Sequence, residues 1–288
     1  MYPPLVYLNG AFVPPEQAQV SAFDRGFVFG DGVYEVIPVY GRRLFRLPHH
    51  LDRLNDSLSS IRLVNPHPPA EWQAIFTRLM EAVAANDQSV YLQVTRGAAP
   101  RDHAFPKETK PTVFAYATPL KYPDAAQLRD GVSAITVDDI RWRRCDIKAI
   151  ALLPNVLLRQ QAVESGAAEA ILVRDGIATE GSASNIFAVI GNVLVTPPKG
   201  AFILPGITRD LVLELARAHQ IPCTERELPV DELFRGSELM LSSSTKELLP
   251  ITRVNDKTIG TGKPGPLHTR LHALYQDYKR EFRAGRVD

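Results

Sequence analysis

The feature that most constrains this fold is a predicted strand followed at once by a predicted helix. Residues 33–40 are rich in β-branched and aromatic side chains, which predicts a strand. Apolar residues then recur at helical spacing, as expected for a helix with one buried face: Leu51, Leu54, Leu58 and Ile61. The chain shows no internal repeat and no heptad pattern, which excludes solenoids and coiled coils. A mixed α+β fold is therefore expected.

The remaining elements follow from the same two periodicities. Asn9-Gly10 between two short apolar runs predicts a hairpin, because this pair accepts the positive φ angles of a two-residue turn. Further strands are expected at 90–95, 112–117, 132–137, 170–173, 185–190 and 238–241. Further helices are expected at 72–83, 153–164, 209–219 and 267–282.

Length and composition suit two domains, because 288 residues with 45% hydrophobic side chains can bury more than one core. Two prolines in the polar stretch after residue 117 predict a linker at 120–124. The chain is accordingly divided into a small N-terminal α+β domain, 1–119, and a larger C-terminal domain, 125–288.

Charge and cysteine content narrow the class of function. The net charge of +1 provides no field to attract nucleic acid or an acidic membrane. Cys145 and Cys223 suit reduced thiols, and no targeting segment or run of roughly 20 apolar residues is found, so a soluble cytoplasmic protein is expected. The histidines lack metal-ligand spacing, and no catalytic metal is expected.

Two short segments suggest chemistry on a small acid. Arg101 and His103, one residue apart, could together bind a carboxylate. Lys148 follows three arginines, which would favour the neutral amine that attacks an aldehyde. Alone, Lys148 is better interpreted as part of a solvated basic segment, because lysines in charged runs usually lie on the surface. Apolar residues alternate with the charges from Trp142 to Ile147, as in a strand with one buried face.

Four other features could complete a site, although each has an ordinary structural reading. Glu180 precedes a turn of small polar residues and could pair with a cationic ring nitrogen. Thr208 is a plausible N-cap of a helix whose free N–H groups would attract phosphate. Hydroxyls at 242–245 and the Arg53 side chain could add to an anion pocket, and Tyr34 could donate a hydrogen bond to a ligand.

Together these segments resemble the fold type IV pyridoxal-phosphate transaminases, and more narrowly the bacterial D-amino acid transaminases. The likeness runs over nearly the whole chain. It is carried by Asp24-Arg25-Gly26, Phe29-Gly30-Asp31-Gly32-Val33-Tyr34-Glu35, His50-Leu51-Asp52-Arg53-Leu54, Val94-Thr95-Arg96-Gly97, Arg101-Asp102-His103, Asp146-Ile147-Lys148, Thr179-Glu180-Gly181-Ser182-Ala183-Ser184-Asn185 and Gly206-Ile207-Thr208-Arg209. The Arg-x-His pair is the part specific to the D-amino acid enzymes.

The resemblance implies a fold of two domains with pyridoxal 5′-phosphate at their interface, and a reaction that cycles between the pyridoxal and pyridoxamine forms. Lys148 would form the Schiff base with the cofactor and move the substrate proton. The other implied cofactor-binding residues are Arg53, Arg141, Glu180, Ile207, Thr208 and Ser244. Those implied to bind substrate are Tyr34, Val36, Arg101, His103, Leu204 and Ser243. Arg101 and His103 would reach in from a partner subunit, which implies a homodimer.

The implied reaction moves the amino group of D-alanine or similar D-amino acids to 2-oxoglutarate or pyruvate. Three alternatives stay open. A branched-chain or (R)-selective amine transaminase could use the same fold, and so could an aminodeoxychorismate lyase, which releases pyruvate without an acceptor. A cofactor-free binding protein would need no reactive lysine.

Overall fold

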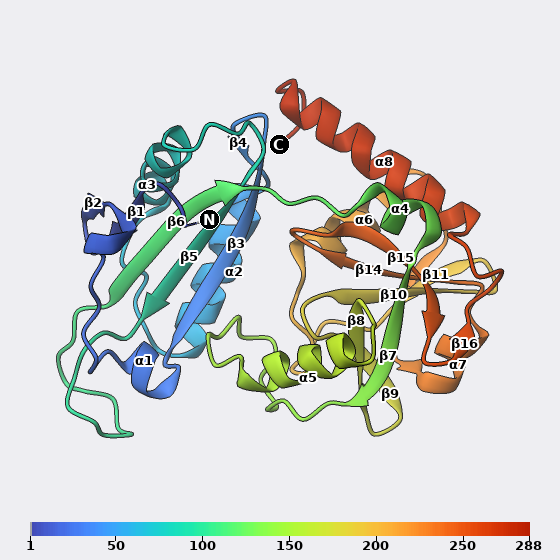
Figure 1. Ribbon diagram of the computed structural model, residues 1–288, viewed down its shortest axis with the longest axis horizontal. Helices are drawn as coiled ribbons and strands as arrows, with labels where there is room; N and C mark the ends of the chain where they lie inside the picture. The colour runs from blue at the N-terminus through green and yellow to red at the C-terminus, as the bar shows by residue number, and fades with distance from the viewer. Residues whose placement is uncertain (1) are drawn as a thin grey trace. The chain divides into compact units, whose positions relative to one another are not determined.

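The computed structural model describes residues 2–288, which form two compact units (Figure 1). The first unit holds the residues up to Lys121 together with Ile147–Leu152 and Asp288, and the second holds Tyr122–Asp146 and Leu153–Val287. The first unit therefore takes a short segment from the second half of the sequence. The division into 1–119 and 125–288 does not include this return of the chain.

The first unit is built on a six-stranded sheet in which every ladder is antiparallel. Its strands, in sheet order, are β2 (Ala11–Val13), β1 (Val6–Leu8), β6 (Thr112–Pro119), β5 (Gln88–Thr95), β3 (Gly32–Tyr40) and β4 (Arg43–Leu44). The β1–β2 hairpin turns at Asn9 and Gly10, whose φ angles are 49° and 95°. The hairpin expected from Asn9-Gly10 is confirmed.

Helices α2 (Leu47–Ser60) and α3 (Pro69–Glu81) pack on this sheet, whereas α1 (Arg25–Phe29) and the 3-10 turn η1 (Pro15–Gln17) are short. Alternation along β3 sends Val33, Glu35 and Ile37 to the buried side, and leaves Tyr34 and Val36 half-buried on the other. Glu35 is therefore a carboxylate on the core face of the strand, a position that requires cationic partners.

The second unit is built on a ten-stranded mixed sheet. Its main path is β12 (Cys223–Glu225), β11 (Val193–Thr196), β10 (Asn185–Ile190), β14 (Glu238–Ser243), β15 (Glu247–Val254), β7 (Val132–Asp138), β8 (Glu169–Arg174), β9 (Ile177–Gly181) and β13 (Leu228–Pro229), with β16 (Lys257–Thr258) paired to β15. Three ladders are parallel: β11 with β12, β15 with β7, and β7 with β8.

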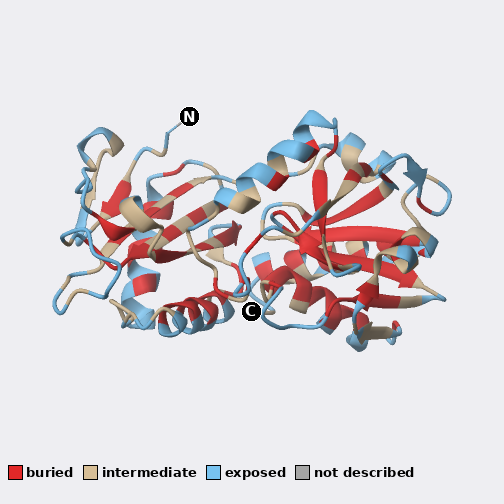
Figure 2. Cartoon of the chain, turned by 90° about the horizontal axis from the view of Figure 1, so that it is seen from below, coloured by how far each residue is buried: buried red, intermediate tan, exposed pale blue. Residues whose placement is uncertain are grey.

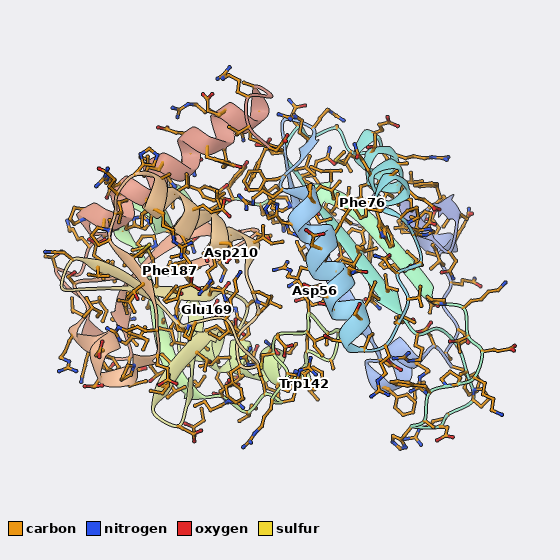
Figure 3. All side chains as sticks on the ribbon, turned by 180° about the vertical axis from the view of Figure 1, so that it is seen from behind. Asp56, Phe76, Trp142, Glu169, Phe187 and Asp210 are labelled. Carbon is orange, nitrogen blue, oxygen red and sulfur yellow. The ribbon has the colours of Figure 1, made fainter. Side chains whose placement is uncertain are left out.

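Five helices surround this sheet: α4 (Ala125–Asp130), α5 (Leu153–Glu164), α6 (Ile207–Ala218), α7 (Val230–Arg235) and α8 (Pro266–Arg283). Helix α5 packs on β7 and β8, while α6 and α8 pack on each other and on β14. In Figure 2 the strands carry most of the buried residues, and exposed residues gather on the outer sides of the helices. Phe187, labelled in Figure 3, is fully buried in this core. The expected α+β class is confirmed.

One local expectation is wrong. The segment from Trp142 to Ile147 is a loop and not a strand, and Trp142 (Figure 3) is 51% exposed. Arg144 in this loop pairs with Asp146, and Arg141 just before it pairs with Asp139, so both cations bind carboxylates two residues away and need no sheet. Strand β6 continues to Pro119, two residues beyond the expected end, and residues 120–124 contain no helix or strand.

No helix among residues 2–288 is both long enough and apolar enough to cross a bilayer.

Candidate functional site

Lys148 is held by main-chain contacts against β3 and α2 in the first unit. Its carbonyl accepts a hydrogen bond from the Tyr34 N–H at 2.9 Å, and its own N–H donates to Ser57 Oγ at 3.2 Å. The next residue, Ala149, forms a β-bridge with Val33. The Lys148 amine lies 4.2 Å from the centre of the Tyr34 ring. The structure thus brings together two of the sequence-predicted residues, Lys148 and Tyr34.

Arg53 lies on the buried side of α2, where it forms a two-bond ion pair with Glu35. Its Nε and Nη2 each donate to a Glu35 oxygen at 2.8 Å, and His50 Nδ1 lies 2.8 Å from the same carboxylate. Burial alone would raise the pKa of Glu35, but Arg53 and His50 outweigh it and hold this pKa well below its usual range. Burial also lowers the pKa of His50, against the opposing effect of Glu35. Glu35 is a residue that the sequence reasoning left without a role, and it orients Arg53.

Arg101 and His103 lie on the long loop between β5 and β6, and both are exposed. Neither side chain makes a hydrogen bond or ion pair with Tyr34 or Lys148 among the described residues. Instead, both pack on Phe29: the Arg101 guanidinium carbon and the centre of the His103 ring each lie 5.3 Å from the centre of the Phe29 ring. The structure brings the Arg-x-His pair together on one aromatic ring.

Glu180, at the end of β9 in the second unit, is a buried carboxylate with three hydrogen-bond donors around it. Its Oε1 accepts from Arg141 Nη1 at 2.5 Å, and its Oε2 accepts from Asn185 Nδ2 at 3.1 Å and from the Leu204 N–H at 3.0 Å. Burial raises the pKa of Glu180 to about 7, although Arg141 opposes the rise. Arg141 also binds Asp139 through Nε at 2.9 Å, so its charge is shared between two acids.

Helix α6 begins next to this carboxylate. Its N-cap is Gly206 and not Thr208, which corrects the expected cap, because the helix already starts at Ile207. No side chain among the described residues caps this end, and a Cβ at Gly206 would lie 1.9 Å from Asn185 Oδ1. Ile207 and Thr208 are both buried in the first turn. The first N–H groups of α6 are thus left to donate to an anion.

The end of β14 and the turn that follows it contain the predicted hydroxyls. Ser243 Oγ accepts the Lys246 N–H at 3.1 Å, which closes the turn that carries Ser244. Ser242 Oγ is buried and has no hydrogen-bond partner among residues 2–288. Ser243 thus ends β14, and Ser244 begins the turn that follows it in the second unit.

A carboxylate that the sequence reasoning missed supports two of these segments. Glu169 (Figure 3), fully buried at the start of β8, accepts hydrogen bonds from Ser182 N at 3.1 Å and Ser184 Oγ at 2.8 Å, and also binds Ser182 Oγ. Lys246 Nζ lies 3.4 Å from Glu169 Oε2, the same oxygen that accepts from Ser184. Glu169 therefore ties the turn after Glu180 to the turn after β14. In the sequence, Glu169 could have been recognised as an acidic residue placed directly before an apolar run that forms a strand.

The donor groups fit the parts of pyridoxal 5′-phosphate. The first unit offers a primary amine beside a tyrosine. The second unit offers a buried carboxylate for a cationic ring nitrogen and, in α6, a helix start without a side-chain cap for a phosphate. An orphaned buried hydroxyl, Ser242 Oγ, lies on the strand that pairs with Asn185.

Comparisons with known proteins agree with this chemistry. The model of the amino-transferase class IV family matches residues 32–254. The D-alanine aminotransferase of Bacillus licheniformis is 42% identical over 272 residues, covering 94% of this chain and 96% of that protein. That of Staphylococcus epidermidis is 40% identical over 274 residues, covering 95% and 97%.

Solved structures give the same picture of the fold. The branched-chain amino acid aminotransferase of Escherichia coli has a TM-score of 0.91 at 24% identity, covering 100% of this chain and 97% of that one. A T.th. branched-chain amino acid aminotransferase with pyridoxamine 5′-phosphate has a TM-score of 0.89 at 25% identity, covering 99% and 96%.

Proposed function

Since the chain belongs to the class IV aminotransferases, which use pyridoxal 5′-phosphate, we propose that it is a D-alanine aminotransferase. It transfers the amino group of D-alanine and similar D-amino acids to 2-oxoglutarate or pyruvate. The observation that carries this proposal is the 42% identity to a D-alanine aminotransferase over 94% of the chain. The Arg-x-His loop supports it, because its arginine and histidine pack on the same ring, and both side chains can donate hydrogen bonds to a carboxylate.

Lys148 is the proposed catalytic residue. When bound, pyridoxal phosphate takes the amino group at its aldehyde carbon and draws electrons from the substrate Cα into its ring. Lys148 Nζ would hold the cofactor, and would then take the proton from the substrate Cα and deliver it to C4′, the aldehyde carbon of the cofactor. The main-chain bonds to Tyr34 and Ser57 support this role, because they fix the residue without using its amine.

Glu180 would pair with the ring nitrogen of the cofactor. A carboxyl group whose pKa lies at about 7 can share a proton with a pyridine nitrogen, since the two affinities are then similar. Arg141 would keep the carboxylate oriented through Glu180 Oε1, and by the resemblance it would lie near the phenolic oxygen of the cofactor.

The phosphate would be bound by the first N–H groups of α6, at Ile207 and Thr208, with Arg53 and Ser244. The uncapped helix start supports this assignment. The substrate carboxylate would be bound by Tyr34, Arg101 and His103. Val36, Leu204 and Ser243 would shape the space for the side chain. The position of the carboxylate selects the D enantiomer, because Lys148 approaches the cofactor from a single face.

The first test is spectroscopic. The cofactor-loaded protein is mixed separately with D-alanine, L-alanine and L-leucine, and the loss of the aldehyde-form absorbance is followed. D-Alanine is expected to convert the cofactor while both L-amino acids leave it unchanged. Conversion by L-leucine alone would instead identify a branched-chain aminotransferase, and no conversion by any of the three would contradict the proposal.

We also propose that the active form is a homodimer in which Arg101 and His103 serve the partner's site. Their lack of contact with Tyr34 or Lys148 among the described residues of one chain supports this arrangement. A cytoplasmic location is proposed as well, which the two free thiols support.

Mixing two inactive variants tests the shared site. Lys148→Ala and Arg101→Ala are each expected to be inactive with D-alanine. After random exchange of subunits, half of the dimers are hybrids with one intact site of two, so activity should recover to about one quarter of the wild-type value. The control mixes Lys148→Ala with Lys148→Ala/Arg101→Ala, where no pairing creates an intact site. Failure to recover, with hybrids shown by mass spectrometry, would place both residues in one subunit's site.

A further inference from the structure

Arg25, the first residue of α1, has a side chain that the proposed reaction does not use. It is only 4% exposed, and its guanidinium reaches three consecutive carbonyls of the loop between β5 and β6. Nη1 donates to the Asp102 carbonyl at 2.5 Å and to that of Ala104 at 3.4 Å, and Nη2 donates to that of His103 at 3.4 Å. One side chain thus holds the main chain on both sides of His103.

Asp31 fixes the guanidinium in this position. Its Oδ2 accepts from Arg25 Nε at 2.8 Å and from Arg96 Nε at 2.8 Å. Burial alone would raise the pKa of Asp31, but the hydrogen bonds from Arg96 and Arg25 hold it below its ordinary value. Asp31 therefore stays ionised and paired at neutral pH, and Arg96 would still compensate its charge in the absence of Arg25.

The base of the same loop is held separately. Asp24 accepts hydrogen bonds from Thr95 Oγ1 at 2.7 Å and from Thr112 Oγ1 at 2.6 Å, one residue at the end of β5 and one at the start of β6. The Arg25 main-chain N–H donates to the Gly97 carbonyl at 2.9 Å. None of these bonds uses the Arg25 side chain. Its removal should free the outer part of the loop and leave the base intact.

Phe29 completes the arrangement, because the Arg25 guanidinium carbon lies 4.8 Å from the centre of its ring. Arg101 and His103 pack on the same ring, each at 5.3 Å. The guanidinium of Arg25 thus holds the main chain at His103 and at the residues on either side of it, and the ring that it contacts packs against the side chains of Arg101 and His103.

We propose that Arg25 is a positioning residue for substrate specificity: by holding the carbonyls of residues 102–104, it sets Arg101 and His103 to receive the substrate carboxylate. This inference rests on the proposed function, since it requires that these two side chains bind the substrate. Loss of the fork-shaped side chain should leave both groups present but mobile, which weakens a carboxylate contact that depends on their spacing.

The test compares Arg25→Met and Arg25→Lys with Arg42→Met. Arg42 is a matched control in the same unit, because its guanidinium donates to the Val83 and Ala84 carbonyls at 3.0 and 3.1 Å, in another turn. Arg25→Lys keeps a cation for Asp31 but cannot span three carbonyls. Because it retains the ion pair with Asp31, Arg25→Lys serves as the test variant if Arg25→Met does not fold.

The first readout is amide hydrogen exchange in the loaded enzyme. The amide of Ala104, which donates to Asp102 Oδ1 at 3.2 Å, is expected to exchange at least about 10-fold faster in both Arg25 variants, because the loop that holds this bond then opens more easily. Amides near Thr95 and Thr112 should keep wild-type rates. The Arg42 variant should change only its own turn. Unchanged exchange of the Ala104 amide would overturn the proposal.

The second readout is steady-state kinetics. KM for D-alanine is expected to rise about 10- to 100-fold in both Arg25 variants, with kcat changed less than about 3-fold. Affinity for pyridoxal phosphate and the rate with an (R)-arylamine, which has no carboxylate, should not fall. Two outcomes would overturn the specificity role. One is faster exchange in the loop with an unchanged KM for D-alanine. The other is an equal loss of rate with every substrate, accompanied by weaker cofactor binding. If the wild-type enzyme itself ignores D-alanine, the proposed function fails, and hydrogen exchange still decides whether Arg25 holds the loop.

Discussion

Replacing Lys148 with alanine is expected to reduce the D-alanine half-reaction by about 10⁴-fold or more, because in the proposed reaction one amine both binds the cofactor and moves the substrate proton. The fold should persist, because the bonds from this residue to Tyr34 and Ser57 come from its main chain. Stopped-flow absorbance after mixing with D-alanine measures the rate. Borohydride reduction followed by mass spectrometry shows whether the cofactor is still attached.

The matched control is Lys257→Ala, since Lys257 is exposed in the second unit, where its amine lies 4.7 Å from the centre of the Phe234 ring. It should retain the wild-type rate and the reduced cofactor adduct on Lys148. An adduct on any other lysine in the wild-type protein would overturn the assignment, whatever the activity of the variants.

The second large effect is expected at Glu180. Changing it to glutamine keeps the size of the side chain and removes the charge that would hold a proton on the ring nitrogen, so the D-alanine half-reaction should slow by about 10²- to 10³-fold. The exposed Glu227→Gln is the control and should match the wild type. A Glu180→Gln enzyme with the wild-type rate would exclude this acid from the cofactor site.

The same variant has a second signature, in the pH dependence of stability. Burial raises the pKa of Glu180 from 4.5 to about 7. Between these values the folded, cofactor-free chain binds a proton that the unfolded chain has lost, so the free energy of unfolding should fall as pH rises from about 4.5 to about 7, by at most about 1.4 kcal/mol per pH unit. Glu180→Gln should lack this fall in urea titrations of the cofactor-free protein. An equal slope in both proteins would contradict the raised pKa.

Periodicity was sufficient where one face of an element is buried. The alternation at 33–40 correctly separated Tyr34 and Val36 from Glu35, and helix α5 begins at the predicted residue. It was insufficient where charges pair over short distances, and the loop from Trp142 to Ile147 was therefore misread as a strand. The prediction of Thr208 as a cap is wrong because a tertiary contact, and not the residue type, determines where α6 begins. Threonine suits a cap, but a close approach to Asn185 requires glycine at 206.

The site was predicted as residue types and not as partners. Lys148, Glu180 and the Arg-x-His pair were recognisable because their motifs are local in the sequence. The contacts that orient these groups were not recognisable, because their partners are distant in the sequence. Glu35 and Arg53 are 18 positions apart, and Arg25 is more than 70 positions from the carbonyls that it binds. Such pairs depend on which strands become neighbours, and this information is absent from any single motif.

The return of Ile147–Leu152 to the first unit has a consequence for recombination between relatives. A chimaera joined at Lys121 would take Lys148, the proposed catalytic lysine, from one parent. Tyr34 and Ser57, which bind the main chain of this lysine, would come from the other parent. Exchange of whole halves at that joint therefore tests the compatibility of the lysine with a foreign support. If Ile147–Leu152 is exchanged together with the first unit, Lys148 stays with the Tyr34 and Ser57 of its own parent.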